Sequence, residues 1–340
     1  MKAVVYSQPE QFSIKEIEKP MVNENQVLIR VQTCGICKTD VHIHLGHFLS
    51  KFPLTPGHEF TGYIVETGKN VTEFKNGDRV VADNTVLCGS CYYCRRDQPL
   101  YCENFYSLGV TGPGGFAEYV VVNHDKVFRI SESLSFDDAS FAEPTACAIH
   151  GMDMIDVRMG DNVLMFGAGP TGLILAQLLR HGGAGNIVVA APTKFKLDLI
   201  EKLNIGIPVQ IDLENSENHI KKIKNIMPVG FDIIIDATGA ASVIQDCFQF
   251  AKKGSKIVIY GVCDEKDKIS LSPYDIFQNE YKIIGSFAQT HCFDRAINAL
   301  ETGIVKVSDL ISHRFSLDEY KIGLEHVINS KKSHKVLIKP

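Results

Sequence analysis

The sequence lacks the features that mark membrane, secreted or polyanion-binding proteins. Its formal net charge is only −5 over 340 residues, so no basic surface is available for nucleic acid or an anionic membrane. Residues 1–11 contain no basic stretch followed by an apolar run, which argues against a secretory signal. The longest apolar stretch, residues 162–179, is interrupted by glycines and a proline and is typical of a buried strand and helix. We therefore expect a cytoplasmic protein without a nucleic-acid or membrane partner.

Internal repeats and low-complexity tracts are also absent. The composition, 45% hydrophobic and 22% charged residues, is that of an ordinary globular protein. A chain of this length exceeds the usual size of a single hydrophobic core, so we expect two domains.

The chain changes character twice. Residues 1–145 consist of short alternating runs separated by turn clusters at 76–78 and 112–115, which predicts an irregular β-rich domain. Residues 146–284 alternate apolar strands with helical segments, which is typical of βαβ units on a parallel sheet. Residues 285–340 return to mixed segments. The predicted fold class is α/β, with strands at 162–166, 187–190, 209–212, 231–236 and 256–260 in the central domain.

Ten cysteines are present, and five of them stand in C-x2-C spacings. In a long chain without a secretory signal, this spacing favours metal-binding thiolates in a reducing compartment over disulfides. The densest group, C-x2-C-x2-C-x7-C, can surround one tetrahedral zinc as a closed structural site. An iron–sulfur cluster is the alternative metal centre, and four unrelated buried thiols are the alternative without a metal. The four cysteines are Cys88, Cys91, Cys94 and Cys102.

A second group has mixed ligands. Cys37 is followed after twenty-one residues by His58 and Glu59, and Glu143 stands later in the sequence Ala-Glu-Pro. A thiolate, an imidazole and a carboxylate are the ligand types of a zinc that keeps one position open for substrate. His58 alone would more often be a buried core histidine than a ligand, but its position downstream of Cys37 favours the metal.

A dinucleotide-binding turn follows the first strand of the central domain. The pattern G-x-G-x-x-G comes directly after residues 162–166 and opens a helix, and this context makes a weak motif specific. Its glycines let the backbone approach a pyrophosphate at the helix N-terminus. The residues of the turn that we assign to the cofactor are Gly167, Gly169, Pro170, Thr171 and Gly172.

The second strand ends in Ala191, where an NAD-binding protein normally carries an acidic residue for the ribose. No carboxylate would repel a 2′-phosphate there, and Thr193, Lys194 and Lys196 offer a hydroxyl and two cations. We therefore expect NADP(H) in preference to NAD(H). The alternative is that the lysines form only a solvated helix face.

The strings GICKTDVH, GHE, the four-cysteine loop, AEP and GAGPTG, in this order, resemble the zinc-containing medium-chain dehydrogenase/reductase (alcohol dehydrogenase) family along nearly the whole chain. A carboxylate at the position of the third zinc ligand resembles the ligand set of the polyol (sorbitol) dehydrogenase branch. The resemblance implies a GroES-like catalytic domain, a Rossmann cofactor domain and two zinc ions per subunit. It implies Cys37, His58 and Glu59 as catalytic ligands, with Glu143 bound directly or through water.

The resemblance further implies hydride transfer between a secondary alcohol, a polyol such as a pentitol or hexitol, and NAD(P), which gives the ketone or ketose. It also implies a proton relay from substrate through Thr39 and the nicotinamide ribose to His42. Lys38 and Lys335 would reach the pyrophosphate, and Thr238 and Gly239 would border the cofactor. The alternative is that Thr39 and His42 only belong to a helix start and that both lysines are surface charges. Residues 276–284 commonly pair across a dimer axis in the family, so we expect a homodimer or homotetramer.

Substrate identity stays open at this point. Polyol dehydrogenases usually carry an arginine where this chain has residues 287–291, which places sorbitol in doubt and leaves pentitols or smaller diols. A sugar-phosphate or polyol-phosphate dehydrogenase would need extra cations in the substrate cleft. A non-catalytic cofactor-binding protein on the same fold is a further alternative, which the retained ligands disfavour. A zinc-free quinone reductase should lack Cys37 and the four-cysteine loop, whereas this chain contains both.

Overall fold

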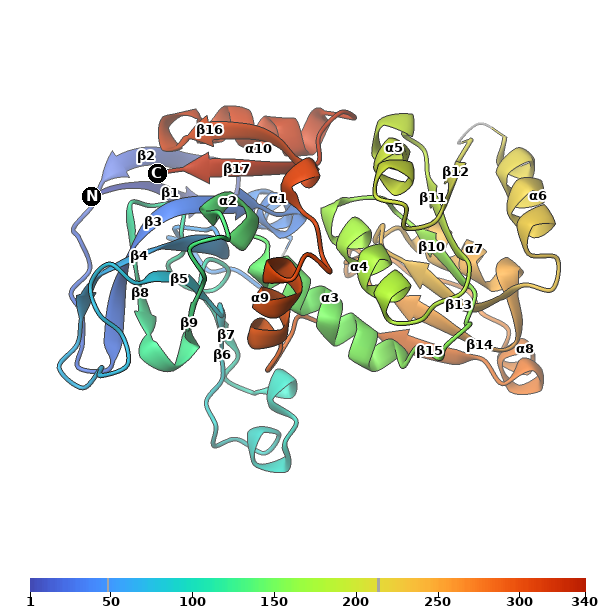
Figure 1. Cartoon of the computed structure of the whole chain (residues 1–340), viewed down its shortest axis with the longest axis horizontal. Coiled ribbons are helices and arrows are strands. Elements are labelled where there is room, and N and C mark those ends of the chain that lie inside the picture. Colours follow the sequence, from blue (N-terminus) through green and yellow to red (C-terminus); the bar gives the residue numbers. More distant parts are fainter. Residues whose placement is uncertain (48, 213–214) are drawn as a thin grey trace. The chain divides into compact units, whose positions relative to one another are not determined.

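The computed structural model describes residues 1–47, 49–212 and 215–340 (Figure 1). The chain forms two compact units, the first made of Met1–Ala146 and Gln289–Pro340 and the second of Cys147–Ala288. The second boundary lies four residues beyond the position expected from sequence. The physical reason is that Ser286 still donates its backbone N–H to Ile259, which extends the pairing of the last two strands of the second unit.

The first unit is built on a seven-stranded, largely antiparallel sheet in the order β16-β17-β3-β4-β5-β9, with β8 paired to β3. Two small two-stranded sheets, β1-β2 and β6-β7, flank it. The strands are β1 (Lys2–Gln8), β2 (Gln11–Glu16), β3 (Gln26–Ile36), β4 (Glu59–Thr67), β5 (Arg79–Ala82), β6 (Thr85–Val86), β7 (Tyr106–Ser107), β8 (Tyr119–Asn123), β9 (Val127–Arg129), β16 (Ile311–Ser316) and β17 (Lys335–Lys339).

Helices of this unit connect the strands or cover the sheet. They are α1 (Lys38–Leu45), α2 (Phe136–Ala139), α3 (Ala142–Ile155), which continues into the second unit, α9 (Phe293–Glu301) and α10 (Tyr320–Asn329). The short 3-10 turns in the described part of both units are η1 (Cys94–Arg96), η2 (Pro99–Tyr101), η3 (His124–Lys126), η4 (Phe248–Phe250), η5 (Ser308–Leu310) and η6 (Leu317–Glu319).

Three strands distant in sequence meet in the middle of this sheet. In the antiparallel register Gly35 of β3 faces Glu59 of β4 on one side and Leu337 of β17 on the other. Figure 1 shows the C-terminal β17 beside β3. The pairing therefore brings the start of β4, the end of β3 and the start of β17 to one end of the sheet.

The second unit is a six-stranded parallel sheet in the order β12-β11-β10-β13-β14-β15. This is the doubly wound order 3-2-1-4-5-6, whose direction of winding reverses between β10 and β13. Its central strands are almost wholly apolar and buried, as parallel strands covered on both faces require. The elements are β10 (Val163–Phe166), α4 (Pro170–His181), β11 (Ile187–Ala191), α5 (Lys194–Lys202), β12 (Ile207–Gln210), α6 (Ser216–Ile226), β13 (Phe231–Asp236), α7 (Ala241–Cys247), β14 (Ala251–Ile259), α8 (Pro273–Asn279) and β15 (Lys282–Gly285).

Two strands start earlier than the sequence predicted, and one of them is β14, which begins at Ala251 rather than at residue 256. β12 begins at Ile207, before Pro208, whereas we had expected the strand to begin after the proline. Proline removes a backbone donor, but β12 is the edge strand of the sheet and does not need that donor. Among the described residues, none of the helices is both long and apolar enough to cross a membrane.

Candidate metal and dinucleotide sites

Cys37 stands at the junction between β3 and α1, where the chain turns from strand to helix. Its backbone N–H donates to Asp40 Oδ2 at 2.8 Å, and its carbonyl accepts the N–H of Asp40 at 3.1 Å. These reciprocal bonds cap the helix start and fix the position from which the Cys37 thiol projects.

His58 and Glu59 lie at the start of β4, directly beside Cys37. Both are buried, with exposures of 3% and 1%. Their ligand atoms and the Cys37 Sγ all lie within 4.8 Å of one another. In a tetrahedral zinc site with metal–ligand distances of about 2.0–2.3 Å, ligand atoms are separated by roughly 3.3–3.8 Å. The donor set and its spacing therefore fit a zinc with an open position.

Gly35 explains why the carboxylate of Glu59 can lie beside Cys37 and His58. A Cβ atom at residue 35 would lie only 2.1 Å from Glu59 Oε2. The side chain of Glu59 packs over the backbone of the neighbouring strand, so a larger residue than glycine at position 35 would displace it.

Asp40 faces His58 inside the site. Its Oδ1 lies 3.7 Å from His58 Nδ1, beyond an ordinary hydrogen bond but within ion-pair range. Burial alone would lower the pKa of His58, but the Asp40 carboxylate and the Cys37 sulfur outweigh it and raise the pKa well above its usual value. Because Asp40 occupies the Nδ1 side, Nε2 is the ring nitrogen left for a metal.

Lys335 occupies the other side of Glu59. Its Nζ lies 2.5 Å and 2.7 Å from the two carboxylate oxygens, and both side chains are almost fully buried. Burial would lower the pKa of Lys335, but Glu59 and the neighbouring Cys37 raise it, so the lysine stays charged. The structure thus gives Lys335 a carboxylate partner, and its contact with a pyrophosphate stays a prediction.

The remaining residues of the catalytic group lie in the same unit. Glu143, in the first turn of α3, does not belong to the close triad, although its charge contributes to the raised pKa of Lys335. Its part as a ligand therefore stays a prediction. Thr39 and His42 both lie on α1, three residues apart and hence on one helix face. Lys38, at the exposed start of the same helix, is separate from the triad.

The four cysteines of the loop also converge. The sulfur atoms of Cys88, Cys91, Cys94 and Cys102 lie within 4.8 Å of one another, and those of Cys88 and Cys102 are 3.5 Å apart. Tetrahedral zinc places its sulfur ligands about 3.8 Å apart. The backbone N–H of Ser90, the side chain of Asn104 and the hydroxyl of Ser90 lower the pKa of Cys88 to about 5. The loop fits a closed zinc site with a thiolate ready at neutral pH.

The glycine turn of the second unit leaves room where a pyrophosphate would lie. Gly167 has a φ of +111°, and a Cβ there would lie 2.9 Å from the Ala237 carbonyl oxygen. A Cβ on Gly169, the N-cap of α4, would meet no atom within 4 Å. Backbone donors and the positive end of the helix dipole thus face open space, which fits a bound phosphate group.

The turn after β13 is held by a buried carboxylate. Asp236 Oδ1 accepts the backbone N–H of Thr238 at 3.0 Å and its hydroxyl at 2.5 Å, while Oδ2 accepts the N–H of Gly239 at 3.0 Å. β13 is the strand at which the winding of the sheet reverses, and dinucleotides bind there. Asp236 therefore shapes the loop in which Thr238 was predicted to border the cofactor.

Two family models match the chain, one within the first unit and one over most of the second unit and the start of the C-terminal segment. Residues 23–132 match the family of the alcohol dehydrogenase GroES-like domain, and residues 170–302 match the zinc-binding dehydrogenase family. D-arabinitol dehydrogenase 1 of Uromyces fabae is 41% identical over 341 residues, covering 100% of this chain and 97% of that protein. The chain belongs to the zinc-binding alcohol dehydrogenases.

Solved structures of zinc-binding dehydrogenases show the same fold. A zinc-binding dehydrogenase from Sinorhizobium meliloti 1021 bound to NADP has a TM-score of 0.93 at 32% identity, covering 100% of this chain and 99% of that chain. A short chain alcohol dehydrogenase from Escherichia coli CFT073, complexed with NADH, has a TM-score of 0.92 at 29% identity and the same coverage. The expected family and the expected pair of GroES-like and Rossmann domains are confirmed.

Sequence reasoning missed two carboxylates of this dehydrogenase. Asp40 stands three residues after Cys37, the spacing of a helix-capping pair, so this signal was available. Asp236 ends a buried strand, but its role depends on hydrogen bonds that the sequence does not display. The pairing of Lys335 with Glu59 joins residues 276 positions apart and has no local signal.

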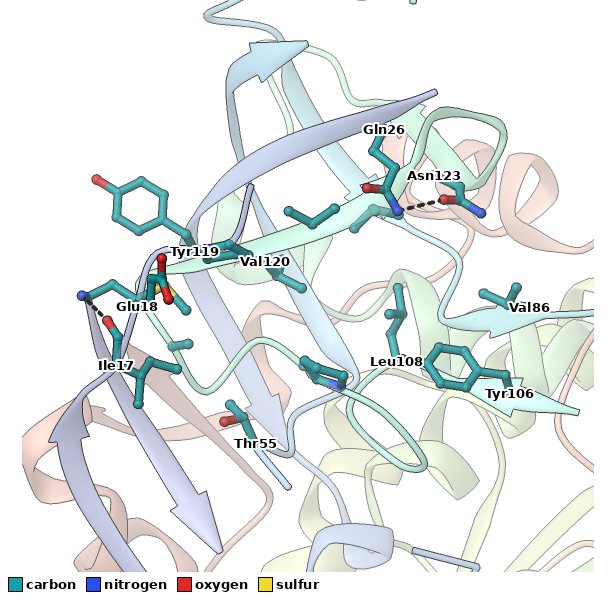
Figure 2. A pocket seen from close by; sticks show the side chains of 17 residues that line it. Ile17, Glu18, Gln26, Thr55, Val86, Tyr106, Leu108, Tyr119, Val120 and Asn123 are labelled. Atoms are coloured by element: carbon teal, nitrogen blue, oxygen red, sulfur yellow. Dashed lines mark hydrogen bonds between the residues drawn. The ribbon is translucent and has the colours of Figure 1, made fainter. Parts of the chain in front are cut away.

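A separate cavity of about 430 Å³ lies in the first unit, and Figure 2 shows its lining. Its labelled side chains include Thr55, Tyr106, Leu108 and Val120, and one hydrogen bond across its rim joins Gln26 to Asn123. None of the residues that line it is a cysteine or a histidine. The cavity therefore carries no group for metal binding by sulfur or imidazole.

The four-cysteine loop gives the first prediction. Cys94→Ser should lower the zinc content by about one ion per subunit and lower the Tm by at least ~4 °C, because a closed metal site contributes directly to folding. Dinucleotide binding by the second unit should persist. Metal analysis and thermal unfolding measure both effects. Cys263→Ser, outside both metal groups, is the matched control, and an unchanged zinc content in Cys94→Ser would remove the structural site.

The Asp40–His58 pair gives the second prediction. Asp40→Asn keeps an oxygen to cap the helix but removes the charge facing His58, so affinity for zinc at the triad or turnover should fall about 10–100-fold. Zinc retention against a chelator and kcat/KM for the alcohol substrate check this. Asp318→Asn, in an exposed ion pair with Lys2, should change neither quantity. Equal behaviour of the two variants would show that Asp40 does not support the ligand.

Proposed function

We propose that this dehydrogenase oxidises a polyol, a pentitol foremost, at a secondary carbon to give the ketose, with NADP⁺ in preference to NAD⁺ as hydride acceptor. The observation that carries the proposal is the thiol–imidazole–carboxylate triad of half-buried Cys37 with buried His58 and Glu59, in a chain that also has a dinucleotide-binding turn. The similarity to a D-arabinitol dehydrogenase over the full chain supports the pentitol.

The ion and the cofactor supply the chemistry that side chains cannot. When bound, zinc acts as a Lewis acid that lowers the pKa of an alcohol, and the dinucleotide accepts a hydride. Cys37, His58 and Glu59 would hold the ion, and Asp40 orients the imidazole. The reaction converts the secondary alcohol and NAD(P)⁺ to the ketone, NAD(P)H and one proton.

The chain itself must move that proton. The Thr39 hydroxyl would receive it from the alcohol, and His42, one helical turn further along α1, would take it towards solvent. Placing both groups on one short helix capped by Cys37 and Asp40 ties their position to that of the triad.

Support for NADP comes from the end of β11. Ala191 is buried and offers no carboxylate, Thr193 is the N-cap of α5, and Lys194 is exposed at the start of that helix. Lys194 Nζ pairs with Asp198 at 2.5 Å, so a 2′-phosphate would have to share this lysine. Lys196 would supply the second cation, and Lys38 and Lys335 are proposed for the pyrophosphate.

The protein is proposed to act as a homodimer or homotetramer. β15 is an edge strand of the parallel sheet, and Ile283 on it is 42% exposed. Phe277 and Tyr274 of the neighbouring α8 are 81% and 65% exposed. An apolar edge of this kind is normally covered, and a second copy would pair with it.

The cysteine clusters would hold metal in a reducing, cytoplasmic compartment.

A substrate panel tests the function. The purified enzyme should oxidise pentitols with a higher kcat/KM than simple alcohols or phosphorylated sugars, and with NADP⁺ better than NAD⁺. Steady-state rates with arabinitols, hexitols, diols, sugar phosphates and both dinucleotides measure this. Activity confined to phosphate esters, or absent on all alcohols despite full zinc content, would refute the proposal.

The relay is tested at Thr39. Thr39→Val keeps the side-chain shape but removes the hydroxyl, so kcat should fall about 10²–10⁴-fold while zinc content and dinucleotide affinity stay the same. Thr39→Ser retains the hydroxyl and should retain most of the turnover. If Thr39→Val turns over as fast as Thr39→Ser, the proton leaves by another route.

A further inference from the structure

A cluster of buried polar side chains lies in the first unit beyond the metal ligands. The members have exposures of 6%, 5%, 3%, 3% and 1%, respectively, although all of them carry polar groups: Asp83, Asn84, Thr85, Ser107 and Gln289. Polar groups at this depth cost free energy unless they are hydrogen-bonded. Their arrangement therefore needs a reason.

The orientation of Gln289 within the cluster is fixed. Its Nε2 donates to Asp83 Oδ1 at 2.6 Å, and the same oxygen accepts the backbone N–H of Thr85 at 2.8 Å. Lys126 Nζ lies 3.3 Å from Asp83 Oδ2. Because Asp83 Oδ1 acts as an acceptor, only the NH₂ side of the Gln289 amide can face it. The carbonyl oxygen of Gln289 must point away from Asp83.

That oxygen is left without a partner. Among the described residues, neither Gln289 Oε1 nor Asn84 Oδ1 has a hydrogen-bond partner, and both are buried. Asn84 is held through its Nδ2, which donates to Ser107 Oγ at 3.0 Å. An unmade hydrogen bond of a buried acceptor costs free energy, and such groups in native proteins usually serve a ligand or an ordered water.

The cluster lies close to the metal ligands within the first unit. β5 is paired with β4 so that Val81 faces Thr61, and Asp83 and Glu59 each lie two residues beyond this pair towards the same end of the two strands. The carbonyl of Asn84 accepts the N–H of Leu108, and the next residue, Gly109, packs so tightly that a Cβ there would lie 2.7 Å from the backbone nitrogen of His58. The unpaired oxygens therefore belong to the end of the sheet that carries the triad.

We infer that Gln289, oriented by Asp83, accepts a hydrogen bond from a substrate hydroxyl other than the one being oxidised, and thereby selects hydroxyl-rich alcohols. Asn84 offers a second acceptor beside it. The inference rests on the proposed polyol dehydrogenase function and names its specificity residue. An acceptor oxygen matches an O–H donor, whereas a phosphate dianion brings only acceptors to the same place and is disfavoured.

Gln289→Met tests the contact, because methionine has a similar shape but no amide oxygen. For the best polyol of the wild-type enzyme, kcat/KM should fall at least about tenfold, mainly through KM. For 2-pentanol, which has only the reacting hydroxyl, kcat/KM should stay within about twofold. If turnover of 2-pentanol is too slow to measure, the inhibition constant of 2-pentanol in competition with the polyol is measured instead of kcat/KM.

Gln177→Met, at a buried glutamine of α4 in the other unit, is the matched control and should leave the polyol-to-pentanol ratio unchanged. An unchanged ratio in Gln289→Met, or an equal loss on both alcohols, would show that Gln289 is structural and would overturn the inference. If the wild-type enzyme oxidises no polyol, the proposed function fails instead, and the two failures are told apart by the wild-type rates alone.

Discussion

The structure of the catalytic unit depends on one buried carboxylate. Glu59 is 1% exposed, packs over the backbone of Gly35 and is bonded by both oxygens to Lys335. A buried charge is tolerable only with a partner, since an unpaired one costs several kcal/mol. The partner comes from the C-terminal strand, so the site exists only once β17 has joined β3. Folding of the whole first unit, from both ends of the chain, is therefore the condition for a metal site.

The same arrangement would set the properties of Glu59 as the proposed metal ligand. Lys335 and a zinc ion would draw on the same carboxylate from different directions, while Asp40 supports His58 and caps the helix that presents Cys37. A carboxylate shared between a lysine and a metal donates less charge to the metal than a free one, which keeps the ion a stronger Lewis acid. The proposed chemistry thus depends on Lys335 and Asp40, the groups that contact the proposed ligands Glu59 and His58.

Local patterns carried most of the prediction from sequence. The four-cysteine loop and the glycine turn are contained in short segments, and their spacing alone predicted groups that the structure brings together. The parallel sheet of the second unit was predicted from alternating strands and helices. The start of β12 was predicted two residues too late, and the sequence does not say that this strand lies at a sheet edge, where Pro208 is tolerated.

Long-range pairings could not be predicted in this way. The contact of Lys335 with Glu59 and that of Gln289 with Asp83 each join segments separated by more than 200 residues. Each is a buried hydrogen bond whose geometry arises only from the folded sheet. Substrate selection depends on such contacts, so the sequence pointed to a dehydrogenase more firmly than to its alcohol.

Anomalous X-ray diffraction at the zinc edge, on crystals of catalytically active protein, tests the central claim most directly. The account predicts a peak about 2.0–2.3 Å from Cys37 Sγ, from a ring nitrogen of His58 and from a carboxylate oxygen of Glu59. The same crystals should show a second peak within the four-cysteine loop. Active protein whose crystals show no anomalous peak among Cys37, His58 and Glu59 would contradict the account.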